Sequence, residues 1–163
     1  TVEENVLVAF DESFTYHMGS AIFRTPGFWK QENEMHEKAI DLLRIFNLEG
    51  LATTQAANLP YGQQRKLEIA RALATGMKLL LLDEPVAGMG QAETEKTARI
   101  LEEIKDRCAV AVVEHDMNFV KSIADDVTVM HEGAILTEGT ANEVMQNKKV
   151  QEVYLGRGEE QHA

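Results

Sequence analysis

Two short apolar runs, each followed at once by polar residues, constrain the fold of this chain most strongly. The first run is Leu79–Leu82, and it ends in the acidic pair Asp83 and Glu84. The second run is Ala109–Val113, and His115 follows it two residues later. Runs of four or five apolar residues between polar clusters are typical of strands buried on both faces of a parallel sheet. The sequence therefore predicts two buried strands.

The segment between the two runs predicts how they are connected. Residues 91–107 carry apolar side chains at helical spacing. A strand, a helix and a second strand in this order form a βαβ unit, whose strands are adjacent and parallel. We therefore predict an α/β fold with a mostly parallel sheet. Asp83, Glu84 and His115 would lie at its carboxyl edge, where open parallel sheets bind their ligands.

A third informative segment, Leu59–Gln63, precedes a predicted helix over residues 62–75. Pro60 suits the first turn of a helix, and Gly62 lets a ligand approach the backbone closely. The free N–H groups and the dipole at a helix N-terminus favour an anion such as phosphate. An ordinary helix start gives the same pattern, and the Asp-Glu pair downstream is what favours the phosphate interpretation.

Taken together, these segments resemble the later part of an ABC-transporter ATPase domain. LPYGQ at 59–63 resembles the signature motif LSGGQ, from which it departs at Pro60 and Tyr61. LLLLDE at 79–84 resembles the Walker B strand, AGMG at 87–90 the D-loop, and His115 the switch histidine. LPYGQQ, AGMG, EHDM and the closing VYLG resemble the ATPase subunits of branched-chain amino acid importers in particular. The resemblance covers essentially the whole chain.

The resemblance implies a role for each motif residue, with ATP and Mg²⁺ as cofactors. Glu84 would polarise the attacking water as general base, and Asp83 would hold Mg²⁺. His115 would contact the γ-phosphate. Tyr61, Gly62 and Gln63 would contact an ATP molecule held by a second ATPase subunit. Since Pro60 replaces the serine of the signature, that contact would rest on backbone N–H groups.

The resemblance also implies partners and a location. The partners would be transmembrane permease subunits and a second ATPase subunit, in a homodimer or a heterodimer. The location would be peripheral, on the cytoplasmic face of the inner (plasma) membrane. Two alternatives stay open: a non-catalytic interaction module, and the ATPase of a related lipid or lipopolysaccharide exporter.

The Walker A loop and the Q-loop glutamine of the family have no match in this chain. A Walker A loop reads Gly-x-x-x-x-Gly-Lys-Ser/Thr, and none of the eleven glycines is followed by such a pair. We therefore expect a fragment of an ATPase, a partial P-loop NTPase core with a helical subdomain. Residues 1–75 would form the signature-bearing helical subdomain, and residues 76–163 the C-terminal half of the core. We expect this chain alone to be inactive.

Composition narrows the other possibilities. The chain has 16 basic and 27 acidic residues, a net charge of −11, which argues against a nucleic-acid partner. The single cysteine, Cys108, excludes an internal disulfide and is expected to be buried. No apolar run approaches the length of a membrane span.

The remaining elements follow from local patterns. Thr1 and Glu4 have the spacing of a capping box, which predicts a helix to about Phe10. Residues 11–30 are expected to be irregular, with aromatic side chains that either pack on the next helix or contact a partner. Residues 31–47 are amphipathic, with Gly50 as the expected stop. A hairpin over 127–137, two short helices and a polar tail of eight residues would complete the chain.

Overall fold

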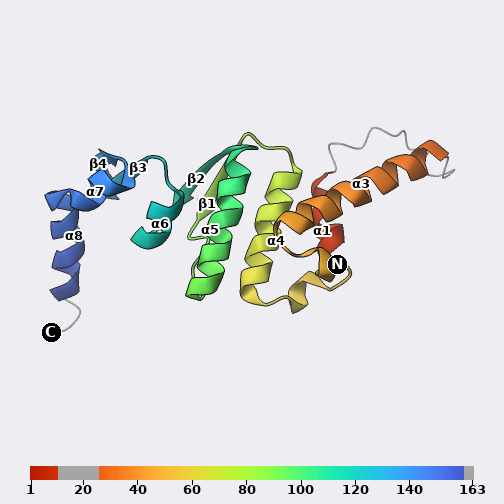
Figure 1. The fold of residues 1–163 in the computed structure, drawn as a ribbon, viewed down its shortest axis with the longest axis horizontal. Helices are drawn as coiled ribbons and strands as arrows, with labels where there is room; N and C mark the ends of the chain where they lie inside the picture. The colour runs from red at the N-terminus through yellow and green to blue at the C-terminus, as the bar shows by residue number, and fades with distance from the viewer. Residues whose placement is uncertain (11–25, 160–163) are drawn as a thin grey trace. The chain divides into compact units, whose positions relative to one another are not determined.

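The computed structural model describes residues 1–10 and 26–159, in two compact units (Figure 1). The first unit is Thr1–Val113 and the second is Glu114–Ala163. The predicted division after residue 75 falls inside the first unit and remains a prediction. None of the helices in the described part has both the length and the apolar character needed to cross a membrane.

The first unit begins with α1 (Val2–Ala9), a short helix capped by its own side chains. Thr1 is the N-cap, and Thr1 and Glu4 form the predicted capping box. The backbone N–H of Val2 donates to the carbonyl of Thr54 at 2.9 Å. Therefore the start of α1 is fixed both by its own cap and by a segment fifty residues later in the chain.

The next described helix, α3 (Pro26–Ile45), begins earlier than the periodicity predicts. The expected irregular segment up to Lys30 is thus wrong over residues 26–30, whereas residues 11–25 lie outside the described part. A proline at the first helical position needs no N–H partner and already has a helical φ angle, so it starts a helix readily. The side chain of Trp29, in the first turns, is 50% exposed.

The end of α3 also differs from the prediction. Asn47 adopts φ 56°, and the N–H of Leu48 donates back to the carbonyl of Leu43 at 2.9 Å. Asparagine tolerates this left-handed conformation better than most residues, and such a residue commonly ends a helix. The predicted stop at Gly50 is wrong, because the chain has already left the helix three residues before it.

Two short 3₁₀ helices, η2 (Glu49–Leu51) and η3 (Ala56–Asn58), lead into α4 (Tyr61–Ala74). Helices α1, α3 and α4 pack on one another and bury a common apolar core (Figure 1). Removing these side chains from water is the main term that stabilises such a cluster. Its buried members include Val2, Val6, Leu43, Phe46, Leu48 and Ala70.

The strands of the first unit confirm the predicted βαβ unit. β1 (Leu79–Asp83) and β2 (Ala109–Val113) are adjacent and parallel, in register from one end to the other. α5 (Gln91–Lys105) connects them, and its side chains Thr97, Ile100, Leu101 and Ile104 are buried. The carboxyl ends of both strands therefore lie at the same edge, as the sequence predicts.

The prediction that both strands are buried on both faces is wrong. Leu80 is 3% exposed, whereas Leu79 and Leu81 are 52% and 71% exposed. Side chains alternate between the two faces of a strand, so one face is covered and the other is bare. Val113 of β2 adds to the bare face with an exposure of 67%. An apolar run shows that a strand is able to bury both of its faces. Among the described residues of this chain, no element covers the face that carries Leu79 and Leu81.

The second unit contains the predicted hairpin. β3 (Val127–His131) and β4 (Ala134–Gly139) are antiparallel, with a bulge after Val129. Glu132 and Gly133 both have positive φ angles, 49° and 80°. Two successive positive φ angles are typical of the two-residue turn that connects the strands of a tight hairpin.

Three helices complete the second unit: α6 (Met117–Ile123), α7 (Ala141–Gln146) and α8 (Lys148–Glu159). Helix α8 is longer than predicted, so the expected polar tail is wrong over residues 156–159. Residues 160–163 lie outside the described part. Thr140 caps α7 through a second capping box, with Glu143.

Candidate functional site

The signature-like segment forms the first turn of α4. Pro60 is the N-cap residue, and its carbonyl accepts the N–H groups of Gln63 and Gln64 at 2.9 and 3.0 Å. No side chain caps this helix, in contrast to α1. A helix start without a capping side chain leaves first-turn N–H groups for another partner. The backbone here is therefore suited to an anion.

Gly62 is buried and lies against α5. A Cβ atom at this position would be 2.8 Å from Oε1 of Glu93, which belongs to the first turn of α5. The absence of a side chain at Gly62 thus lets the carboxylate of Glu93 approach the start of α4 closely. Sequence reasoning selected Gly62 for a ligand but missed Glu93, because the helical pattern of α5 does not reveal which side chain faces α4.

Tyr61, at the start of α4, belongs to a local network of polar side chains. Its hydroxyl accepts a hydrogen bond from Nε of Arg65 at 3.0 Å, and the guanidinium lies 5.3 Å from the ring centroid. Nη1 of Arg65 binds Glu68 at 2.8 Å. The hydrogen bond to Glu68 and, second, that to Tyr61 raise the pKa of Arg65. The tyrosine ring also lies near Gly88, whose φ angle is 73°.

The acidic pair lies at the end of β1. Glu84 extends the strand pairing by one bond, because its N–H donates to the carbonyl of Val113 at 2.9 Å. Its φ angle is 44°, a left-handed conformation that costs free energy for any residue except glycine. This turn breaks the alternation of the strand, so that Asp83 and Glu84 need not point to opposite faces.

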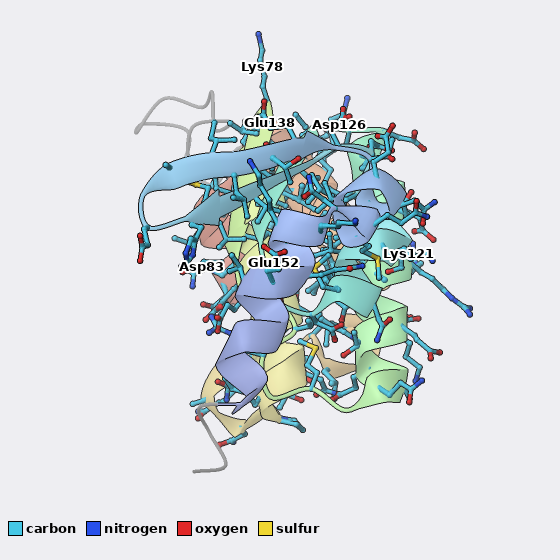
Figure 2. All side chains as sticks on the ribbon, turned by 90° about the vertical axis from the view of Figure 1, so that its left-hand side faces the viewer. Lys78, Asp83, Lys121, Asp126, Glu138 and Glu152 are labelled. Atoms are coloured by element: carbon cyan, nitrogen blue, oxygen red, sulfur yellow. The ribbon has the colours of Figure 1, made fainter. Side chains whose placement is uncertain are left out.

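Asp83 borders a hollow of about 290 Å³ between β1 and α4. The hollow is lined on one side by Arg65 and Glu68 and on the other by residues 80–83. Figure 2 labels Asp83 at the end of β1 and Lys78 before its start, at opposite ends of the strand. The metal candidate and the signature helix thus belong to one body.

His115 belongs to the second unit, whereas Asp83 and Glu84 belong to the first. Its side chain is 72% exposed, and its Nδ1 lies 3.8 Å from the carboxylate of Glu114. The neighbouring Asp116 is the N-cap of α6 and accepts the N–H of Asn118 at 2.9 Å. The histidine is therefore presented at the start of a capped helix.

Five of the six predicted site residues lie in the first unit and His115 lies in the second; the five are Tyr61, Gly62, Gln63, Asp83 and Glu84. Within the described residues, no group of three His, Cys, Asp or Glu side chains is placed to hold a metal ion. A single carboxylate such as that of Asp83 suits Mg²⁺ only where water and phosphate oxygens complete its six ligands.

Comparison with known protein families gives two matches. Residues 1–87 match the family described as ABC transporter. Residues 134–160 match the one described as branched-chain amino acid ATP-binding cassette transporter. The first match covers the signature-like segment and the acidic pair.

Two curated relatives carry matching descriptions. The chain is 39% identical over 158 residues to the high-affinity branched-chain amino acid transport ATP-binding protein BraF of Pseudomonas aeruginosa. It is 36% identical to LivG, of the same description, from Escherichia coli. Both alignments cover 96% of this chain and 62% of the relative. The chain therefore spans less than two thirds of the length of these relatives.

A relative with lower identity has a description that names a different transport process. The lipopolysaccharide export system ATP-binding protein LptB of Escherichia coli is 32% identical over 124 residues, which is 76% of this chain. Among solved structures, the fold matches MJ1267, an ATP-binding cassette of an ABC transporter, with a TM-score of 0.75 and 31% identity. That match covers 94% of this chain and 62% of MJ1267. The ADP conformation of MJ1267 gives a TM-score of 0.74.

Proposed function

Because the chain belongs to the ABC transporter family, we propose that it is the C-terminal part of a subunit that hydrolyses ATP. The observation that carries this proposal is the acidic pair Asp83–Glu84 at the end of a parallel strand, in the same unit as the uncapped start of α4. Because the chain spans 62% of its relatives, the activity is proposed for the parent protein.

The roles of the chain's own residues follow from this geometry. Glu84 is exposed at the strand end and would accept a proton from the attacking water, a contribution of about 10²–10⁴-fold. Asp83 would hold Mg²⁺, which neutralises phosphate charge when it is bound. The N–H groups at the start of α4, with Gln63, would contact the phosphates of an ATP bound to a second subunit. His115 would donate a hydrogen bond to the γ-phosphate.

The proposed partners are transmembrane permease subunits and a second ATPase subunit, at the cytoplasmic face of the membrane. The transported solute is proposed to be a branched-chain amino acid. This choice is supported by the higher identity to BraF and LivG than to LptB. Export of a lipid or lipopolysaccharide remains the alternative, and so does a chain that binds partners without catalysis.

The proposal is tested in the full-length parent with Glu84→Gln, which preserves size and hydrogen bonding but cannot accept the proton. ATP turnover should fall by about 10²-fold or more, with ATP binding retained and the ATP-bound dimer accumulating. Glu37→Gln, an exposed acid on α3, is the matched control and should hydrolyse ATP normally. Near-normal turnover by the Glu84 variant would assign the base to another residue.

A further inference from the structure

A second hollow of the first unit is larger than the one beside Asp83. Its volume is about 580 Å³, and it lies between the end of α3, one face of α4 and one face of α5. Of the predicted site residues only Gln63 borders it, and neither Asp83 nor Glu84 does. It is thus separate from the acidic pair.

Lys66 of α4 is the unusual residue of this hollow. The residue is 8% exposed, and no hydrogen bond or ion pair involves it among the residues that the structure describes. In the same part of the chain, every side-chain nitrogen or oxygen that is fully enclosed has a hydrogen-bond partner. The ammonium of Lys66 is therefore not fully enclosed, and it reaches the hollow that its side chain lines. A cation held at such a position is costly unless an anion or water compensates it.

Two more cations come from the facing helix. Lys96 and Arg99 lie three residues apart on α5, and both line the hollow. Neither forms an ion pair within the described part of the chain. The hollow is thus lined by three cations against two carboxylates, in a chain with a net charge of −11. Their convergence from two helices suits a ligand with several oxygens.

Two carboxylates, those of Glu93 and Glu103, also line this hollow. They repel a fully ionised anion, yet each accepts a hydrogen bond from a ligand that keeps a hydroxyl group. Inorganic phosphate keeps a P–OH group at pH 7, as H₂PO₄⁻ or HPO₄²⁻, because its last proton leaves only in strongly alkaline solution. Sulfate has no such proton. The mixed lining thus discriminates between two oxyanions of the same shape.

From these contacts we infer that the hollow between α3, α4 and α5 binds a protonated oxyanion of the phosphate class. Lys66, Lys96 and Arg99 bind the ionised oxygens, and Glu93 or Glu103 accepts the hydroxyl. Because the site joins α4 to α5, a bound phosphate stabilises the packing of the signature helix on the βαβ unit. This inference stands apart from the proposed ATP hydrolysis, since it uses other residues and needs no second subunit.

The test uses the 163-residue chain and inorganic phosphate. A ligand that binds only the folded state raises the unfolding temperature with a saturable dependence on concentration. Phosphate should do so at pH 7, whereas sulfate and chloride at matched ionic strength should not. Vesicles of phosphatidylserine should not bind either, because the phosphodiester has no P–OH at this pH and the headgroup has no other hydroxyl group. This arm separates free phosphate from a lipid headgroup.

Variants assign the effect to the hollow. Lys66→Met preserves the apolar stem and should reduce phosphate affinity about tenfold or more, the effect of losing about 1.4 kcal/mol. Lys66→Arg should restore binding. Lys38→Met, on the exposed face of α3, changes the net charge equally and should bind phosphate normally. Glu103→Gln should weaken the discrimination against sulfate.

If Lys66→Met does not fold, the double variant Lys96→Gln and Arg99→Gln is used instead, because both residues are exposed. The same loss of phosphate affinity is expected. Equal stabilisation by phosphate and sulfate, unchanged in these variants, would identify an ordinary salt effect and overturn the inference. Loss of affinity in Lys38→Met as large as in Lys66→Met would do the same. An inactive parent protein with intact phosphate binding would overturn only the proposed ATPase.

Discussion

Oε1 of Glu93 lies 2.8 Å from the position that a Cβ atom on residue 62 would take, so the first turn of α5 closes directly on Gly62. The contact joins the signature-like helix to the helix that follows the acidic pair. A change at Gly62 is therefore expected to affect both packing and access to the backbone.

Gly62→Ala separates these two effects. Alanine is favoured over glycine by up to about 1 kcal/mol within a helix, and this gain at the first turn offsets the displacement of the flexible Glu93 side chain. The free energy of unfolding of the chain should change by less than about 1 kcal/mol. ATP hydrolysis by the parent protein should nevertheless fall about tenfold or more, a loss of about 1.4 kcal/mol, because the methyl group covers the backbone. Gly50→Ala, where nothing lies within 4 Å, is the control for both measurements.

At residue 84, a glycine variant should be more stable than an alanine variant, which is the reverse of the order inside a helix. Its φ angle of 44° is strained for alanine and unstrained for glycine. Glu84→Gly should therefore be more stable than Glu84→Ala by about 1 kcal/mol in chemical denaturation, the lower end of the cost of such strain. At Glu37, inside α3, the same pair of variants should show the opposite order. Equal stability of the two variants at residue 84 would show that the turn is not strained.

The bare face of the β1–β2 sheet should promote association of the isolated chain. Leu79, Leu81 and Val113 expose apolar side chains on it, and large exposed apolar patches drive association. Sedimentation velocity should show species larger than a monomer as concentration rises, and Leu81→Glu should reduce them. Ile135→Glu, at an exposed apolar position of the second unit, should have little effect. A chain that stays monomeric at high concentration would contradict this expectation.

The isolated chain should not hydrolyse ATP. Phosphoryl transfer depends mainly on groups that position and neutralise the phosphates, and the sequence has no Walker A loop to supply them. Steady-state assays with Mg²⁺ should give background rates, and calorimetry should show no tight ATP binding. Reproducible turnover that disappears in Glu84→Ala would reveal a phosphate cradle elsewhere in the chain.

The capping box of α7 should make the second unit sensitive to acid. Hydrogen bonds from the backbone and then the side chain of Thr140 lower the pKa of Glu143 below its usual value of 4.5. The folded state therefore binds this proton more weakly than the unfolded state. The stabilisation is present above pH 4.5 and is lost as the pH falls through the folded pKa. Glu143→Gln should weaken this acid dependence, as measured by urea denaturation between pH 7 and pH 3, and high salt should reduce the difference.

Patterns of neighbouring residues were sufficient to predict much of this chain. The alternation of strand, helix and strand predicted that β1 and β2 are parallel, and the Thr1–Glu4 spacing predicted the cap of α1. The motifs around Gly62 and Asp83 predicted the family. These features depend on local periodicity and on backbone chemistry, which a sequence records directly.

Other features depend on contacts between segments far apart in the chain. Three such features are the contact of Glu93 with Gly62, the position of Lys66 at a hollow shared with α5, and the bare face of β1. An apolar run shows what a strand is able to bury, but not which layer covers it. Local sequence patterns were enough to predict most helices and strands and to select the residues that are able to bind ligands or transfer protons. Their environments were decided by packing, because burial and pairing depend on neighbours that no local pattern specifies.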